Sequence, residues 1–175
     1  MPAAPAELFA TLDRLGIAHR TVTHAALFTV EQSQALRGQI PGGHTKNLFL
    51  KDKKSALYLV TALEDTTIDL KSLHRLLGAS GRFSFGSAEQ VRDTLGVEPG
   101  AVTPFGAIND TAHRVAVVLD AALLAHAEIN AHPLTNTMTT TLARDDLVKF
   151  LRATGHEPRI VAFALPSPQG ESPAP

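Results

Sequence analysis

Hydrophobic residues recur at helical spacing in several short segments of the chain. Leu8, Leu12 and Leu15 share one face of the first of these segments, a helix that we expect over residues 6–15. Capping residues at the start of similar segments predict further helices. These are expected over residues 29–36, from 69 to about 77, from 87 to 95, and over 145–154.

Short apolar or alternating runs between these helices predict strands. The strands are expected over residues 17–23, 46–52, 56–61, 114–120, 128–130, 137–142 and 159–164. The second and third runs lie on either side of Lys53-Lys54-Ser55 and predict a hairpin. Because strands and helices interleave through short links, we expect an α+β fold with a mixed, mostly antiparallel sheet, not a doubly wound parallel sheet.

Length and composition favour one folded domain. The chain has 175 residues, of which 44% are hydrophobic and 19% are charged, as in ordinary globular proteins. We expect the domain over residues 1–165 and a disordered proline-rich tail over 166–175. The sequence has no apolar run of 18 residues and no basic segment followed by an apolar one at its start. We therefore expect no membrane segment and a cytoplasmic protein.

Charge and residue usage exclude several classes of function. Lysine plus arginine number 16 and aspartate plus glutamate 17, so any nucleic-acid contact must use a local basic patch. The absence of cysteine excludes disulfides, thiolate nucleophiles and cysteine-ligated metals. No GxSxG, P-loop, GxGxxG or HExxH motif occurs, so a covalent mechanism has no candidate. A metal hydrolase would need His24, His44 and His132 to converge, and we keep it as an alternative.

The segment GGHTKNLFLKDKK, residues 42–54, is the first of three irregular segments that suit chemistry. A strand that begins at Lys46 places this lysine on one face with two leucines, at the mouth of an apolar pocket. There its ammonium would meet a phosphate or a carbonyl oxygen; the alternative is a lysine that extends to solvent. Lys53 and Lys54 add to a dense positive patch, or are a soluble hairpin tip.

The other two segments are loops. Gly100 to Pro104 has glycine and proline four residues apart, so it can expose consecutive backbone N–H groups that bind a carbonyl, a carboxylate or an oxyanion. A simple turn is the alternative. In Asn130-Ala131-His132-Pro133, the proline restricts the His132 backbone and gives its ring a defined direction. His132 would then position a substrate or transfer protons, or it is a structural hydrogen-bonding residue.

These segments also occur in an order that resembles a known family. GGHTKNLFLKDKK with YLVTAL, then LGVEPGAVTPFGAIND, then EINAHPLTNTMTTTL are similar to the YbaK/ProX aminoacyl-tRNA editing proteins. Within that family the chain is most similar to the free-standing prolyl-tRNA editing group known as ProXp-ala, which hydrolyses Ala-tRNA(Pro). The resemblance covers roughly residues 6–165.

The resemblance implies a single α+β domain homologous to the editing insertion of bacterial prolyl-tRNA synthetases. The residues it implies for catalysis are Lys46, His132 and Gly100, and those it implies for substrate binding are Asn47, Val102, Thr103 and Pro104. We also expect Thr45, next to Lys46, and the basic residues Lys53 and Lys54 to bind substrate, and we expect no cofactor and no metal. The partners that the resemblance implies are alanine-charged tRNA(Pro) and, as a further candidate, prolyl-tRNA synthetase. Ala131 departs from the pattern, since relatives often carry a bulkier aromatic residue there.

The chemistry of such a reaction suits the residues present. An aminoacyl ester is already activated, so hydrolysis needs a positioned water and oxyanion stabilisation more than a strong nucleophile. Backbone amides and a substrate hydroxyl would position and activate that water. Two other functions stay open: a Cys-tRNA(Pro) deacylase of the same family, and a non-catalytic module that binds tRNA or an aminoacyl group.

Overall fold

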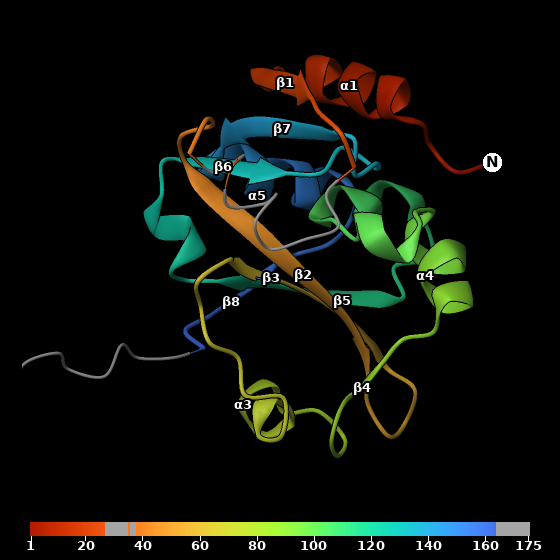
Figure 1. Cartoon of the computed structure of the whole chain (residues 1–175). Coiled ribbons are helices and arrows are strands. Elements are labelled where there is room, and N and C mark those ends of the chain that lie inside the picture. Colours follow the sequence, from red (N-terminus) through yellow and green to blue (C-terminus); the bar gives the residue numbers. More distant parts are fainter. Residues whose placement is uncertain (27–34, 36–37, 164–175) are drawn as a thin grey trace, which may run out of the picture.

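Eight strands form one sheet in the computed structural model, which describes residues 1–26, 35 and 38–163 (Figure 1). The strands are β1 (His19–Thr23), β2 (Gly43–Lys51), β3 (Leu57–Leu63), β4 (Ser84–Phe85), β5 (Val115–Asp120), β6 (Glu128–Ala131), β7 (Met138–Ala143) and β8 (Arg159–Val161). Seven of them follow the order β1-β7-β6-β2-β3-β5-β8, and β4 pairs with β2 off this path. The nine-residue β2 therefore lies at the centre of the sheet.

The sheet is mixed, as the sequence predicts. Antiparallel pairing joins β1 to β7, β6 to β7, β2 to β3 and β2 to β4. Parallel pairing joins β2 to β6, β3 to β5 and β5 to β8. The expectation of a single α+β domain with a mixed, mostly antiparallel sheet is confirmed, although the parallel pairs are more numerous than short hairpin links suggest.

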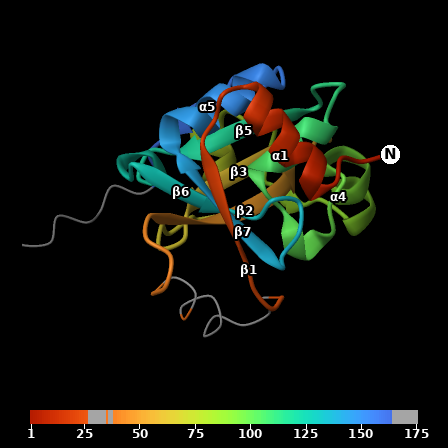
Figure 2. The ribbon, with the colours of Figure 1, turned by 90° about the horizontal axis from the view of Figure 1, so that it is seen from above.

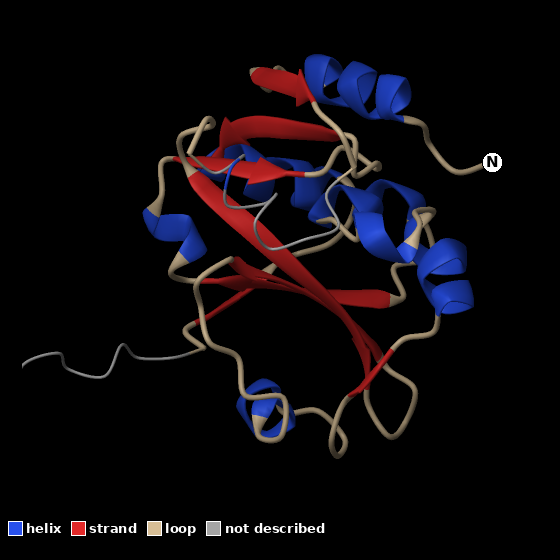
Figure 3. Ribbon diagram, viewed as in Figure 1, coloured by secondary structure: helices blue, strands red, loops and turns tan. Residues whose placement is uncertain are grey.

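Helices cover the sheet (Figure 3). The α-helices are α1 (Pro5–Arg14), α3 (Leu73–Leu77), α4 (Ala88–Leu95) and α5 (Arg144–Ala153), and the 3-10 helices are η1 (Pro99–Ala101), η2 (Pro104–Asn109) and η3 (Leu123–Ala125). The four α-helices confirm four of the five predicted helices, with α3 starting later than expected. Apart from residue 35, the helix predicted over 29–36 lies outside the described residues, as does the tail over 166–175. Within the described ranges, no helix combines the length and the apolar character that a membrane span requires.

The two faces of the sheet bury separate hydrophobic cores. The main core joins α1, α4 and α5 to one face, with Phe105 and Phe150 in edge-to-face contact at 5.4 Å between ring centroids. Viewed from above, α1 and α5 lie on the same side of the strands (Figure 2). The smaller second core covers the opposite face, where Leu73 and Leu77 of α3 pack on Leu50 and Val60.

Several boundaries differ from the sequence prediction because they depend on distant partners. The strand β2 begins at Gly43 and not at Lys46, since Gly43 and His44 pair with β6. The short β4 was not predicted; both of its residues are exposed, so no apolar pattern marks it. The predicted loop over 98–106 holds η1 and the start of η2.

A buried cluster around Asp110 joins the start of β5 to the end of α5. One carboxylate oxygen of Asp110 lies 2.9 Å from Nε2 of His156, and both residues are buried. The same oxygen accepts the amide of Val115 at 2.9 Å. Burial alone would raise the pKa of the Asp110 carboxyl. The hydrogen bonds from His156 and from two backbone amides outweigh burial, so this pKa lies below the usual range of an aspartate.

We expect Asp110→Asn to lower the free energy of unfolding at pH 7 by about 3 kcal/mol, because it leaves a buried partner uncompensated. A carboxyl whose pKa is lowered by folding stabilises the protein above about pH 4 and loses this contribution as the pH falls further. The difference between wild type and variant should therefore shrink below pH 4 in urea titrations. Asp145→Asn, at an exposed position, is the control. Equal stability of wild type and Asp110→Asn at pH 7 would contradict this assignment.

Candidate active site

Lys46 and Asn47 leave the central strand β2 on opposite faces. Lys46 lies on the face of Leu48 and Leu50, which pack in the second core, as its alternation predicts. Its ammonium donates a hydrogen bond to the backbone carbonyl of Thr66. On the other face, the Asn47 side-chain oxygen accepts a 2.7 Å hydrogen bond from the Thr61 hydroxyl.

A glycine just before β2, Gly42, allows the chain to approach β6 closely. Gly42 has a φ of +107°, and a Cβ there would lie 2.9 Å from the carbonyl oxygen of Glu128. Because Gly42 has no side chain, Asn130 can come close enough for its side-chain amide nitrogen to donate a 3.1 Å hydrogen bond to the Pro41 carbonyl. The Thr45 hydroxyl, expected to bind substrate, donates to the Asn130 carbonyl at 2.9 Å. Thr45 thus holds the two strands together in this structure.

His132 follows β6 directly and is half-buried. Its Nδ1 lies 3.1 Å from the Met138 carbonyl, so Nδ1 carries the proton in that hydrogen bond. Burial lowers the pKa of His132, against the smaller opposing effect of the Met138 bond, and the nearby His24 lowers it further. The neutral ring therefore has an Nε2 lone pair that can accept a hydrogen bond.

His24 lies beside His132 on the face of β6 and β7 that is opposite the main core. The two ring centroids are 6.5 Å apart. Nε2 of His24 lies 2.8 Å from the hydroxyl of Thr139, which is on the same face of β7 as Thr141. Thr141 pairs with Asn130 on β6, and Asn130 pairs in turn with His44 on β2. By strand alternation this face also carries Lys46, so His24, His132 and Lys46 share one face of the sheet.

The loop from Gly100 to Pro104 supports His132 from the other direction. The Thr103 hydroxyl donates a 2.6 Å hydrogen bond to the backbone carbonyl of His132 and accepts the amide of Phe105 at 3.3 Å. Among the described residues, no group accepts a hydrogen bond from the amide of Thr103. Gly100 itself is exposed. It borders a hollow of about 120 Å³ between this loop and residues 134–136.

Lys53 and Lys54 lie away from these groups, at the other end of β2. Both are exposed at the tip of the β2–β3 hairpin. The buried carboxylate of Asp52 shapes this tip by accepting the amides of Lys54, Ala56 and Ser80. The structure thus brings His132 and the 100–104 loop together and leaves the two hairpin lysines apart from them.

The three histidines of the metal alternative do not form a ligand set. His44 Nε2 lies 2.8 Å from the Ile40 carbonyl, and His24 and His132 each bond a carbonyl through Nδ1. In residues 1–26, 35 and 38–163, no three or more histidine, aspartate or glutamate side chains gather where they could hold a metal ion.

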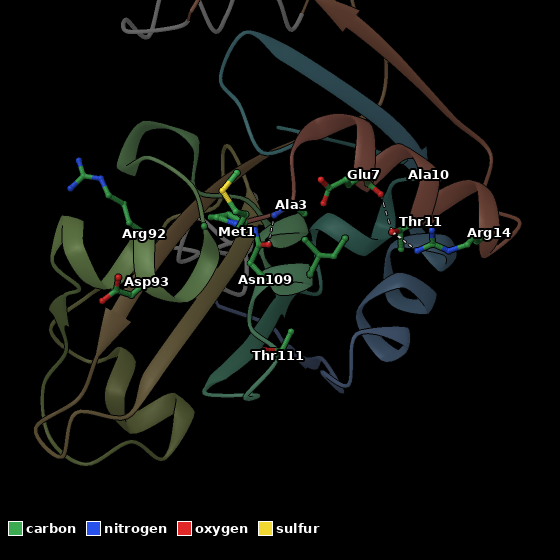
Figure 4. A pocket seen from close by; sticks show the side chains of 13 residues that line it. Met1, Ala3, Glu7, Ala10, Thr11, Arg14, Arg92, Asp93, Asn109 and Thr111 are labelled. Carbon is green, nitrogen blue, oxygen red and sulfur yellow. Dashed lines mark hydrogen bonds between the residues drawn. The ribbon is translucent and has the colours of Figure 1, made fainter.

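A further hollow of about 650 Å³ lies between α1, α4 and η2 (Figure 4). The close-up shows Glu7, Arg14, Arg92 and Asn109 around it. Charges of both signs line it, and Asn109 uses its side-chain oxygen to accept the Ala3 amide at 2.8 Å. None of the residues predicted to act chemically lines this hollow.

Sequence reasoning missed three residues that support the site. Asn130 was singled out only as a neighbour of His132, and Thr66 and Asp120 were not singled out for chemistry. An aspartate that ends a buried apolar strand, as in VAVVLD, is the available signal for Asp120. Ala131, which departs from the family pattern, is buried in the main core and lies on the opposite face from His24.

We expect the His132 ring to titrate below the pH at which a peptide histidine does, because its pKa is lowered. The unfolded chain then binds a proton at His132 first, so the free energy of unfolding falls as the pH drops from about 6.5 to the lowered pKa. Two-dimensional NMR of the histidine rings, with His132→Asn to assign the signal, measures this midpoint. His24→Asn should raise it slightly. A midpoint at or above that of a peptide histidine would contradict the assignment.

Comparisons with known proteins agree with the resemblance seen in the sequence. Residues 24–150 match the family described as the aminoacyl-tRNA editing domain. The chain is 40% identical over 162 residues to the mouse prolyl-tRNA synthetase associated domain-containing protein 1, covering 90% of this chain and 95% of that protein. It is 35% identical over 150 residues to the prolyl-tRNA editing protein ProX of Acetoanaerobium sticklandii, covering 85% and 91%.

A solved structure has the same fold. The crystal structure of a candidate trans-editing enzyme for prolyl tRNA synthetase superposes with a TM-score of 0.67 and 22% sequence identity, covering 94% of this chain and 100% of that one. The family match and the two relatives extend over most of the chain. The chain therefore belongs to the aminoacyl-tRNA editing domain family.

Proposed function

We propose that the chain is a trans-editing deacylase that hydrolyses the ester of mischarged Ala-tRNA(Pro) in the cytoplasm. The family match supports the class of reaction, and the names of the relatives support tRNA(Pro) as the tRNA and prolyl-tRNA synthetase as a partner. The observation that carries the proposal is the 2.6 Å hydrogen bond from Thr103 to the His132 carbonyl. It joins two segments that were selected separately for chemistry from the sequence.

In the proposed mechanism a water molecule attacks the carbonyl carbon of the ester. The amides of Val102 and Thr103 stabilise the oxyanion, since the loop that carries them lies against His132. A ribose hydroxyl of the substrate helps to position and activate the water. The bond from the carbonyl carbon to the ribose oxygen then breaks, that oxygen takes a proton, and the products are free alanine and tRNA.

His132 and Lys46 orient the substrate in this proposal. Because Nδ1 of His132 is bound to Met138, the free Nε2 accepts a hydrogen bond from the α-ammonium of the alanyl group. The Lys46 ammonium has further N–H groups besides the one bound to Thr66, and these suit an oxygen of the terminal adenosine or the ester. Neutral His132 is thus a positioning group more than a proton donor.

We expect catalytic amounts of the protein to release alanine from 3′-labelled Ala-tRNA(Pro) and to leave Pro-tRNA(Pro) intact. A site sized for a methyl group excludes the proline ring by collision. It favours alanine over glycine by only about 1–3 kcal/mol, the value of one methyl-sized contact. Deacylation assays on the alanyl, prolyl, cysteinyl and glycyl esters measure this selectivity.

Lys46→Ala should reduce alanine release by at least about a hundredfold, as loss of a positioning group at the ester does. Lys149→Ala, an exposed lysine on α5, is the matched control and should keep the wild-type rate. Preferential loss of the cysteinyl ester would keep the mechanism and change the substrate. Hydrolysis of none of the esters by wild type would leave a binding module as the function.

We expect Lys53→Ala with Lys54→Ala to raise KM about fivefold to tenfold and to leave kcat nearly unchanged. Exposed lysines remote from the ester contribute phosphate contacts, which affect binding of ground and transition states equally. The salt dependence of kcat/KM should weaken at the same time, by about one unit of logarithmic slope per lost contact. Steady-state kinetics from 50 to 200 mM salt, with Lys149→Ala as control, measure both. A fall in kcat with unchanged KM would contradict this role.

A further inference from the structure

The turn over residues 63–66 connects a buried carboxylate to the ammonium of Lys46. This turn follows β3 and is closed by the Thr66 amide, which donates to the Leu63 carbonyl at 2.9 Å. The carbonyl of Thr66 accepts the hydrogen bond from Lys46. Lys46 and the turn lie beside each other because Lys46 pairs with Ala62, the residue before Leu63.

The carboxylate belongs to Asp120, the last residue of β5. Its side chain is 1% exposed. One oxygen accepts the Thr66 hydroxyl at 2.5 Å and the Leu63 amide at 3.1 Å, and the other accepts the Ala122 amide at 2.9 Å. β5 runs parallel to β3, so the ends of both strands meet at the same edge of the sheet and Asp120 reaches the turn directly.

Thr66 is therefore held at three points. Its hydroxyl is bound to Asp120, its amide to Leu63, and its carbonyl to Lys46. A lysine side chain has four rotatable bonds and loses considerable conformational entropy when it is fixed in one conformation. A carbonyl that is itself fixed gives the ammonium one preferred position. A carbonyl on a loose turn would not.

We propose that Asp120 and Thr66 are positioning residues that place the Lys46 ammonium for the deacylation reaction. This inference rests on the proposed function of Lys46. Neither residue touches the substrate; both act through the Thr66 carbonyl. The turn is thus a part of the catalytic apparatus that the family motifs in the sequence do not include.

The test compares two substitutions at Thr66 with a matched one elsewhere. Thr66→Val removes the bond to Asp120 but keeps the backbone carbonyl, and should lower kcat for Ala-tRNA(Pro) about tenfold with KM within about twofold. Thr66→Ser keeps a hydroxyl and should recover most of the wild-type rate. Thr154→Val removes another hydroxyl with two partners, at the end of α5 on the opposite face of the sheet, and should leave kcat unchanged. Asp120→Ala, which removes both acceptor oxygens, should behave like Thr66→Val.

A second readout does not depend on catalysis. NMR of protein that carries isotope-labelled lysine side chains reports whether the Lys46 side chain is fixed, and Lys46→Arg assigns the signal. Thr66→Val should shift and narrow the Lys46 Cε signal toward that of a free lysine, and Thr154→Val should not. If no ester is hydrolysed by wild type but this shift occurs, the proposed function fails and the anchoring of Lys46 stands.

Two outcomes would overturn the inference. The first is a Lys46 signal that is the same in wild type and Thr66→Val. The second is a loss of kcat in Thr154→Val equal to that in Thr66→Val, with equal losses of unfolding free energy in urea, since this would make the effect one of stability alone.

Discussion

The junction between β2 and β6 at Asn130 is the contact on which the arrangement of the site depends. It joins the part of the sheet formed by β1, β7 and β6 to the part formed by β2, β3, β5 and β8. Only Gly43 and His44 of β2 pair with β6. The short pairing is reinforced by Asn130, which is 2% exposed and uses its amide nitrogen, its side-chain oxygen and its backbone carbonyl in hydrogen bonds.

This junction explains why glycine precedes the site lysine in the sequence. The buried side-chain amide of Asn130 needs hydrogen-bond partners, and one of its hydrogen bonds goes to the Pro41 carbonyl. Any side chain at Gly42 would occupy the space of Asn130 and Glu128. Gly42 therefore permits the close approach at which β2 pairs with β6, and that pairing places Lys46 and His132 on the same face. Packing alone thus requires the glycine at position 42 of the GGHTKNLFLKDKK segment, whatever the chemistry of the site.

Local patterns in the sequence predicted the elements that are made by local forces. The capping box of Ser87 and Gln90 marks the start of α4, and the alternation along β2 places Lys46 and Asn47 on their observed faces. The start of β2 at Gly43 was not predictable in this way, because it depends on pairing with a strand more than eighty residues later. The two-residue β4 has no apolar signal of its own.

The same distinction holds for the site. The sequence marked the loop from Gly100 to Pro104 and the segment at His132 as separate candidates, and each has a recognisable local pattern. Their contact through Thr103 spans 29 positions. The link between Asp120 and Thr66 spans 54, and neither residue lies in a motif. Hydrogen bonds between residues that are far apart in the chain leave no periodic trace in the sequence, so only the folded structure shows them.

The length of β2 has a consequence for how a tRNA would lie on the protein. One continuous strand carries Lys46 near its beginning and leads to Lys53 just beyond its end. At about 3.3 Å per residue, the seven steps from Lys46 to Lys53 span at most about 23 Å, and a strand in a sheet cannot stretch or contract appreciably. Under the proposed function, the rigid strand β2 fixes the distance between the acylated end of the tRNA at Lys46 and the phosphate contacts at Lys53.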